Sequence, residues 1–383
     1  MFPRPLFGLA LTIALLTSAL RAQEAVIGSR GSFAGAPSQA AQVLTGHKHP
    51  VHAVAISPDM KTIISGGGEI KLPFSSKPGQ KQAMNVKDAA VMSRGEGLIW
   101  DVTTGKHRSL QPPPGRINGL SFSHDGKGIG GYLEKSPWAR NQPQIPTVGF
   151  WDAKTGRAAT HRLGLNSPKA LSFSEDGKVV VVAGGFLDLS AREPNRVQGH
   201  IILLMHYPAM TVRQQIDIET KALGVAFYAD SRFVAYNVDQ SVHVFVIETG
   251  KERVVIPNAP FGNMQISPDG KVLAILGEQI SQRHEIQLFS METGAAIGAP
   301  AFVGSTWSRV FAFSPDSQQL AIVTGWESYE NLICVWSIAD RKEVARFVGH
   351  QDNVYSLAFS REGSFLVSGS LDKTVRIWKL KSE

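Results

Sequence analysis

The stretch FVGHQDNVYSLAFSREGSFLVSGSLDKTVRIW, residues 347–378, decides the fold of this chain. It contains three short runs of apolar residues that alternate with small or polar ones, and the turn-forming sequences SREGS and SLDKT separate the runs. Alternation with a period of two over short runs is the pattern of half-buried β-strands joined by tight turns. The stretch therefore predicts consecutive antiparallel strands.

The same unit recurs seven times along the chain. Each unit has one strand that ends in an acidic turn and a later apolar strand that ends on a large side chain. The turn acids are Asp59, Asp125, Asp176, Asp230, Asp269, Asp316 and Glu362. The large residues are Trp100, Trp151, Met205, Phe245, Phe289, Trp336 and Trp378. Repeats of roughly 40–50 residues that hold four short strands are the size of propeller blades. The sequence predicts an all-β fold, a seven-bladed β-propeller of four-stranded antiparallel blades.

The spacing inside the repeat places the variation in length on one face of the propeller. The steps from each large residue to the next turn acid are 24–27 residues, whereas the steps from a turn acid to the large residue of its own unit are 15–41. If the strands of a blade are named a to d, the variable step contains the b–c connection. The b–c connections of all blades open on one face. The largest insertions are residues 69–96, 133–146 and 186–197, in three neighbouring blades.

The last blade needs a strand from elsewhere, because too few residues follow Trp378 for a fourth strand. Leu44 lies 15 residues before Asp59, just as Leu110 lies 15 residues before Asp125. We therefore expect residues 42–44 to form an N-terminal strand that completes the last blade, closes the ring and pairs an otherwise exposed edge. The predicted propeller domain spans residues 41–383.

The first residues have the pattern of an export signal. Arg4 precedes the apolar run LFGLALTIALLTSAL, and we expect cleavage near Ala22. Residues 1–22 are thus a predicted signal peptide and residues 23–40 a flexible linker. An uncleaved anchor is the alternative, but the apolar run is short for a membrane span. The cleaved chain is expected in the periplasm or outside the cell, without an integral membrane segment and as a monomer.

The charge of the chain does not indicate nucleic-acid binding. The formal net charge is +7, and loss of two arginines with the signal peptide leaves +5, which is modest for a chain of 383 residues. We therefore expect no nucleic-acid partner.

The first and last repeats resemble the WD-repeat β-propeller family, and with its leader the chain looks like an exported, bacterial-type member. The resemblance rests on LTGHKHPVHAVAISPDMKTIISGG and on residues 347–378. It implies a structural hydrogen-bond network in the last blade, made of His350, Ser368, Asp372 and Trp378. In the first blade the implied network contains His47, Ser65 and Trp100 but no turn aspartate. The other repeats lack parts of this pattern, so we expect their blades to depend on apolar packing.

The b–c insertions and one d–a connection carry the candidate partner-binding residues. Aromatic and arginine side chains on a rigid frame are the usual composition of an interface. The candidates are Phe74, Lys77, Lys81, Trp138, Arg140, Phe186, Arg192, Arg196, Trp307, Trp326 and Tyr329. For any single aromatic residue the alternative is that it pins its own loop to the blades. For the face as a whole we predict binding, because insertions in repeat proteins tend to lie on the functional face.

The sequence HKHPVH places His47, His49 and His52 close together. Three histidines could ligate Zn or Cu. However, the resemblance gives His47 a structural role, and no acidic or cysteine partner is nearby in the sequence. We expect no metal here, and we expect His49 and His52 to be solvent-exposed loop residues.

The sequence contains none of the motifs His-Glu-x-x-His, Gly-x-Ser-x-Gly or paired cysteines, and no phosphate-binding loop. The turn acids are expected to form turns rather than to catalyse. The single cysteine, Cys334, lies in the apolar run NLICVW and is expected to be a buried, inert thiol.

We predict a non-catalytic, exported scaffold without a cofactor, which binds a protein partner through the b–c face. One alternative is a propeller enzyme or small-ligand binder that uses the central channel. Polar residues at equivalent positions of several blades would favour it, and the sequence analysis finds none. Another alternative is binding of acidic envelope polymers by the basic loops, which rising salt would weaken.

Overall fold

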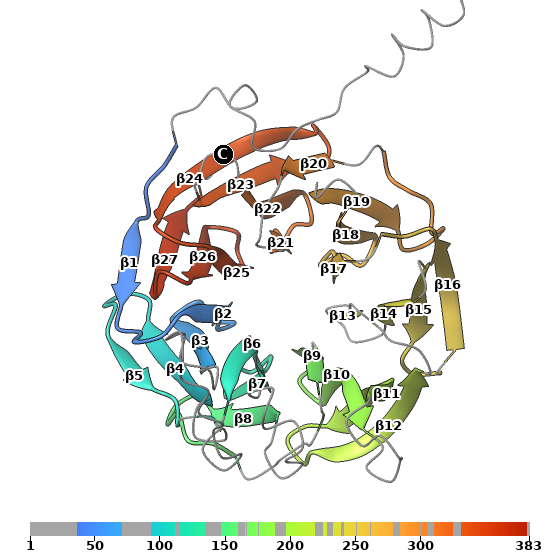
Figure 1. Ribbon diagram of the computed structural model, residues 1–383, viewed down its shortest axis with the longest axis horizontal. Helices are drawn as coiled ribbons and strands as arrows, with labels where there is room; N and C mark the ends of the chain where they lie inside the picture. Colours follow the sequence, from blue (N-terminus) through green and yellow to red (C-terminus); the bar gives the residue numbers. More distant parts are fainter. Residues whose placement is uncertain are drawn as a thin grey trace, which may run out of the picture.

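The strands form seven antiparallel sheets arranged in a ring, so the chain is a seven-bladed β-propeller (Figure 1). A computed structural model describes residues 37–70, 93–111, 113, 115–134, 147–159, 165, 167–174, 176–187, 197–218, 225–227, 233–238, 241–249, 251–260, 262–278, 284–298, 301–304, 310–324 and 331–380. Within these ranges every regular element is a β-strand, and no helix is long and apolar enough to cross a membrane. The predicted signal peptide lies outside the described residues.

The blades follow one another along the chain. Blade 1 contains β2 (Val51–Ile56), β3 (Thr62–Ile70), β4 (Ser93–Asp101) and β5 (His107–Ser109). Blade 2 contains β6 (Arg116–Phe122), β7 (Gly128–Glu134) and β8 (Val148–Asp152), and blade 3 contains β9 (Ser167–Phe173), β10 (Val179–Leu187), β11 (Val197–His206) and β12 (Thr211–Ile218). Blade 4 contains β13 (Val225–Phe227), β14 (Phe233–Val238), β15 (Ser241–Val246) and β16 (Lys251–Pro257).

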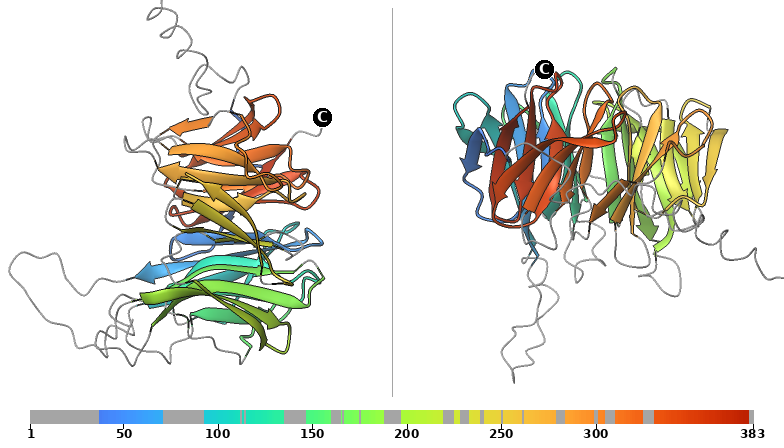
Figure 2. Two further views of the ribbon diagram at one scale, coloured as in Figure 1. Left: turned by 90° about the vertical axis from the view of Figure 1, so that its right-hand side faces the viewer. Right: turned by 90° about the horizontal axis from the view of Figure 1, so that it is seen from above.

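The remaining blades lead back to the start of the ring. Blade 5 contains β17 (Gly262–Ile266), β18 (Val272–Glu278), β19 (His284–Ser290) and β20 (Ala301–Gly304). Blade 6 contains β21 (Phe311–Phe313), β22 (Gln319–Thr324), β23 (Asn331–Ser337) and β24 (Lys342–His350). Blade 7 contains β25 (Val354–Phe359), β26 (Phe365–Ser370), β27 (Thr374–Lys379) and β1 (Gln42–Thr45). The first strand of each blade lies nearest the centre, and the blades stand side by side across the thickness of the disc (Figure 2).

The acidic turns between strands a and b are held by one local pattern of hydrogen bonds. In blade 1 the hydroxyl of Ser57 donates to Asp59 at 2.6 Å, and Asp59 accepts from the Lys61 amide at 3.1 Å. The amide of Thr62 donates back to Ser57 at 2.9 Å. The same Ser–Asp hydrogen bond recurs at Asp125, Asp176, Asp269 and Asp316. These carboxylates therefore form turns, in the way that Asp side chains do when they bind nearby backbone amides.

The apolar core is divided among the contacts between neighbouring blades. Each of seven clusters of buried residues joins two adjacent sheets, and the seven clusters complete the circle. Between blades 7 and 1, for example, Leu44, Val375 and Trp100 pack together. Because each sheet is covered on both faces by its neighbours, burial of apolar surface stabilises every blade only in the presence of the next one.

Strand β1 joins the start of the propeller to its end. It pairs antiparallel with β27, from Gln42 opposite Ile377 to Thr45 opposite Thr374. The chain before β1 also reaches blade 6, because the amide of Ser38 donates to the carbonyl oxygen of Arg346 at 2.8 Å. Both ends of the described chain therefore hold the outer edge of the same sector.

The b and c strands of three blades extend further than the sequence analysis expects. In blade 1 the β3–β4 ladder continues to the pair Ile70 and Ser93, so the segment between the strands is residues 71–92 rather than 69–96. Strand β7 likewise continues to Glu134, and β10 continues to Leu187. The glycine-rich sequences at these positions hide the strands, because glycine shows no apolar–polar alternation although its backbone still pairs.

Strand β1 provides a test of ring closure. Leu44 is 2% exposed, whereas its neighbour Val43 is 44% exposed and points away from the core. We expect Leu44→Ala to lower the free energy of unfolding by about 2–3 kcal/mol, because it leaves a cavity between blades 7 and 1. Val43→Ala, the matched control, should change it by less than about 0.5 kcal/mol. Urea unfolding of both variants measures the difference, and equal effects would contradict a closing role for β1.

Candidate interaction face and central channel

A chain of hydrogen bonds crosses blade 7 from the outer part of the sheet to the d–a connection. The indole Nε1 of Trp378 donates to Ser368 Oγ at 2.8 Å, and Ser368 lies 2.7 Å from His350 Nε2. His350 Nδ1 lies 2.7 Å from Asp372 Oδ2. An indole can only donate and a carboxylate can only accept, so Ser368 donates to Nε2 and the histidine proton resides on Nδ1. All four groups implied by the resemblance are thus joined in one direction.

The Ser368–His350–Asp372 arrangement has the connectivity of a catalytic triad, but it is closed to substrates. The Ser368 side chain is 0% exposed, and its oxygen already accepts the indole proton of Trp378. A nucleophile must reach a reacting carbon, and a triad must leave room beside the hydroxyl for an oxyanion. This network therefore stabilises the blade and does not catalyse.

Blade 1 contains the same network with a different acid. Ser65 Oγ accepts from Trp100 Nε1 at 2.6 Å and lies 2.6 Å from His47 Nε2. His47 Nδ1 donates to Glu96 at 3.0 Å, and the amides of Lys48 and His49 also donate to Glu96. The sequence analysis finds no carboxylate for this blade, and that expectation is wrong. Glu96 lies in strand β4, four residues before Trp100, and its longer side chain reaches the position that a turn aspartate occupies in blade 7.

Both acids are held in their ionised form. Partial burial opposes ionisation of Glu96, but the hydrogen bonds from His47 and Lys48 outweigh it and lower its pKa to about 2. Burial likewise opposes ionisation of Asp372, and the hydrogen bond and charge of His350 together with Thr374 hold its pKa well below the usual range. The charges therefore persist at neutral pH and tie each d–a connection to its own b–c hairpin.

The other blades use different contacts at the equivalent positions. In blade 2 the indole of Trp151 donates to the backbone carbonyl of Gln111 at 3.1 Å. In blade 4, Ala235 replaces the strand-b hydroxyl and is 0% exposed within an apolar cluster. Burial raises the pKa of Cys334 in blade 6 to about 12, so this thiol stays protonated and unreactive.

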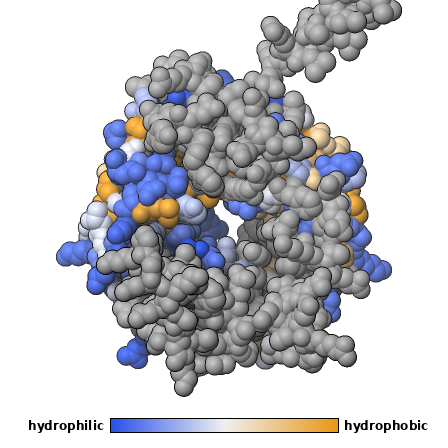
Figure 3. Space-filling view, in the orientation of Figure 1, coloured by the Kyte–Doolittle hydropathy of each residue, from blue (hydrophilic) through white to orange (hydrophobic). Residues whose placement is uncertain are grey.

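A cavity of about 710 Å³ lies at the centre of the ring, between the inner strands of the blades. The centre of the disc is hollowed in the space-filling view (Figure 3). Residues of β2, β6, β7, β9, β17, β21 and β25 line the cavity, so it is the central channel. Apolar side chains such as Leu120, Leu171 and Met264 form much of its wall.

Three polar side chains close on one another at the end of the channel where strand β7 runs into the b–c connection of blade 2. Arg116 forms an ion pair with Glu134, and its Nε donates to Asn118 at 3.0 Å. Asn118 donates in turn to Glu134 at 2.8 Å. Burial opposes ionisation of Glu134, but the hydrogen bond from Asn118 and the charge of Arg116 outweigh it, so its pKa lies below the usual value. We call Arg116, Asn118 and Glu134 the mouth cluster.

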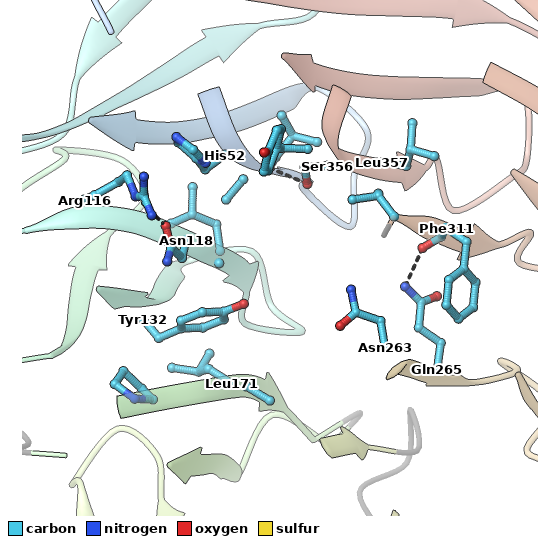
Figure 4. A pocket seen from close by; sticks show the side chains of 18 of the residues that line it. His52, Arg116, Asn118, Tyr132, Leu171, Asn263, Gln265, Phe311, Ser356 and Leu357 are labelled. Carbon is cyan, nitrogen blue, oxygen red and sulfur yellow. Dashed lines mark hydrogen bonds between the residues drawn. The ribbon is translucent and has the colours of Figure 1, made fainter. Parts of the chain in front are cut away.

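Two aromatic side chains from neighbouring blades lie beside the mouth cluster (Figure 4). The rings of His52 and Tyr355 meet edge to face with centroids 5.2 Å apart. His52, Asn118 and Tyr355 each lie seven residues before the acid of their own a–b turn. The channel therefore has polar side chains at equivalent positions of three blades, which the sequence analysis does not find.

His52 differs from the exposed loop residue that the sequence predicts. It belongs to strand β2 and is half-buried in the channel wall. Burial and the nearby charge of Arg116 lower its pKa to about 4, against the opposite effect of Glu134. His47 already uses both ring nitrogens, for Glu96 and Ser65. In the described part of the chain no group of three His, Cys, Asp or Glu residues could hold a metal ion.

The candidate partner-binding residues fall almost entirely outside the described residues. This holds for Phe74, Lys77, Lys81, Trp138, Arg140, Arg192, Arg196, Trp307, Trp326 and Tyr329. For Phe186 the structure places the backbone in strand β10 and does not describe the side chain. A partner-binding role for these residues stays a prediction.

Residues 38–69 and 341–379 match the WD domain, G-beta repeat. These two segments are WD repeats. They form parts of blades 1, 6 and 7, and they include the histidine and serine of both hydrogen-bond networks. The family match is therefore strongest where the networks lie.

Proteins similar to this chain contain WD repeats or bear names that describe association. The chain is 22% identical to the Serine-threonine kinase receptor-associated protein of Gallus gallus over 80% of this chain and 82% of that protein. It is 38% identical to the Intraflagellar transport protein 122 homolog of Danio rerio over 72 residues, 19% of this chain and 6% of that protein. It is 32% identical to an Uncharacterized WD repeat-containing protein of Synechocystis sp. over 31% of this chain and 32% of that protein. The chain thus spans only a small fraction of the length of some relatives.

The acid of the blade 1 network provides a second prediction. Glu96→Ala leaves the donors of His47, Lys48 and His49 without their acceptor, so we expect a loss of about 1–3 kcal/mol in the free energy of unfolding. Glu69→Ala is the matched control. Glu69 lies 3.8 Å from His49 and its side chain is 46% exposed, so its removal should cost less than about 0.5 kcal/mol. Chemical denaturation of both variants checks the difference, and equal stability of the Glu96 variant and the parent would refute the assignment.

The buried channel histidine predicts a dependence on pH. His52 titrates near its ordinary value of 6.5 when unfolded and at about 4 when folded, so the unfolded state binds more protons between these values. Stability should therefore fall as the pH drops from 6.5 towards 4. His52→Gln should lose less stability over this range than the parent, whereas replacement of the exposed His124 by Gln should leave the slope unchanged. Melting temperatures across the range provide the measurement.

Proposed function

We propose that the protein is a non-catalytic, exported scaffold that binds a protein partner through the face on which the b–c connections open. The observation that carries the proposal is the position of the two networks. Each one ties a d–a connection to a b–c hairpin, at His47 with Glu96 and at His350 with Asp372. Ion pairs between half-buried partners with several hydrogen bonds hold their backbone firmly. The blade 1 segment 71–92 thus starts from a rigid frame.

A scaffold role is supported by the family as well as by the chemistry. Propellers with WD repeats typically mediate protein interactions. The one Ser–His–Asp arrangement among the described residues is buried and already satisfied, so it offers no nucleophile. The proposed partner is a protein and not a nucleic acid, and the propeller is proposed to act as a monomer. The leader pattern of residues 1–22 supports export to the periplasm or beyond.

Shortening one hairpin tests the proposal. Ile70 and Ser93 are directly paired, so replacing residues 71–92 by Asn-Gly gives a two-residue hairpin turn while keeping Glu96 and its network. We expect this variant to melt like the parent and to lose at least about tenfold in affinity for the protein that the parent captures from its native compartment. Surface plasmon resonance with the purified partner measures the loss.

The control alters the opposite face. Lys127 and Lys271 are exposed on a–b turns, and their replacement by glutamate should leave partner affinity unchanged. If the shortened variant keeps full affinity, or if the control loses it, recognition does not occur through the blade 1 hairpin.

A further inference from the structure

The central channel has the size and composition of a small-molecule site. Its volume of about 710 Å³ lies within the range of pockets that enclose drug-sized ligands. Such pockets combine a mostly apolar wall with a few polar groups that fix orientation. Here Leu120, Leu171, Met264 and Leu357 supply apolar surface from four different blades.

One hydroxyl group is directed into this channel without a partner. Figure 4 shows the ring of Tyr132 lying across the channel wall with its hydroxyl pointing into the cavity. No hydrogen bond joins this hydroxyl to any residue that the structure describes. Burial raises the pKa of Tyr132, so the hydroxyl keeps its proton and can both donate and accept.

The position of Tyr132 depends on the strand beside it. Gly119 of β6 is the paired neighbour of Tyr132 in β7. A Cβ atom at Gly119 would lie 1.9 Å from a carbon of the tyrosine ring, which no real contact allows. The absence of a side chain at Gly119 therefore makes the space in which the ring lies, and the hydroxyl is held in place from behind.

Two further groups on the channel wall keep unused hydrogen-bonding capacity. The side-chain nitrogen of Gln265 donates to the carbonyl oxygen of Phe311 at 2.6 Å, which leaves the Gln265 side-chain oxygen to accept. Ser356 Oγ accepts from the amide of Val54 at 3.0 Å, which leaves the hydroxyl proton to donate. Donors and acceptors thus face the channel from blades 2, 5 and 7.

The described wall offers these groups without an unpaired charge. Arg116 is neutralised by Glu134 within the mouth cluster. His52 carries no charge at neutral pH, since its pKa is about 4. A charged ligand would lose its hydration on entering a mostly apolar channel and would find no opposite charge there, whereas a neutral ligand avoids that cost.

We propose that the central channel binds a small, uncharged ring molecule that carries several hydroxyl groups, of which a neutral pyranose sugar is the simplest example. The apolar faces of the ring pack against the leucine and methionine side chains of the wall. Its hydroxyl groups exchange hydrogen bonds with Tyr132, Gln265 and Ser356. This site is separate from the proposed partner-binding hairpin and does not depend on it.

Four monosaccharides that share one ring test the proposal. Titration calorimetry on the mature chain uses glucose and N-acetylglucosamine as neutral probes, and glucuronate and glucosamine as charged ones. We expect saturable, millimolar binding of at least one neutral sugar and at least about tenfold weaker binding of the charged sugars. Absence of saturable binding of both neutral sugars, or equal binding of all four, would overturn the proposal.

Conservative variants locate the site. Tyr132→Phe removes a single oxygen and keeps the ring, and we expect it to weaken binding of the preferred neutral sugar about tenfold. Tyr236→Phe is the matched control, because Tyr236 packs between blades 3 and 4 and does not line the channel. Gln265→Leu gives a second, independent loss should Tyr132→Phe fold poorly, and melting temperatures report folding. Unchanged sugar affinity in a folded channel variant would place binding elsewhere and refute the proposal.

Discussion

Closure of the ring is the constraint on which the rest of this structure depends. A single four-stranded sheet with two apolar faces cannot bury them alone, and a row of such sheets would still expose the two outermost faces. In this chain the contact between blades 7 and 1 buries those faces, with Leu44 and Trp100 at its centre. Strand β1 also pairs with β27, so the joint combines backbone hydrogen bonds with apolar packing. The channel exists because closure holds seven inner strands at a fixed distance from one axis.

The hydrogen-bond networks have a narrower role than the apolar contacts. They occur in blades 7 and 1, which are the two blades that meet at the joint. In other blades Trp151 bonds to a backbone oxygen, and Ala235 replaces the hydroxyl altogether, yet these sheets form equally well. A satisfied buried network contributes only modestly to stability but strongly to a unique arrangement. The networks therefore specify how the joint and its hairpins are arranged, while burial of apolar surface provides most of the stability.

The fold could be predicted from the sequence because a repeat reports its own length. The even spacing of the turn acids from Asp59 to Glu362 gives seven units without knowledge of any contact. The blade 7 network could also be inferred, because His350, Ser368 and Asp372 stand at the spacing of the resembled family. Glu96 could not, because it lies in strand c after a long insertion and takes the place of a turn residue. The channel residues could not either, because His52 and Asn118 look like ordinary members of alternating strands. They form one set only when the ring brings the starts of the inner strands together.

The mouth cluster links the two surfaces to which we assign binding. Arg116 and Asn118 lie at the start of the inner strand β6, whereas Glu134 lies at the end of β7, where the b–c connection of blade 2 begins. A molecule in the channel and a partner on the b–c face would therefore both lie next to the same closed group of side chains. Any change that one of them makes in this cluster alters the affinity for the other, and thermodynamic linkage makes the effect equal in both directions. The closed ion pair sets the size of such coupling, since opening it would expose an unpaired charge to an apolar wall.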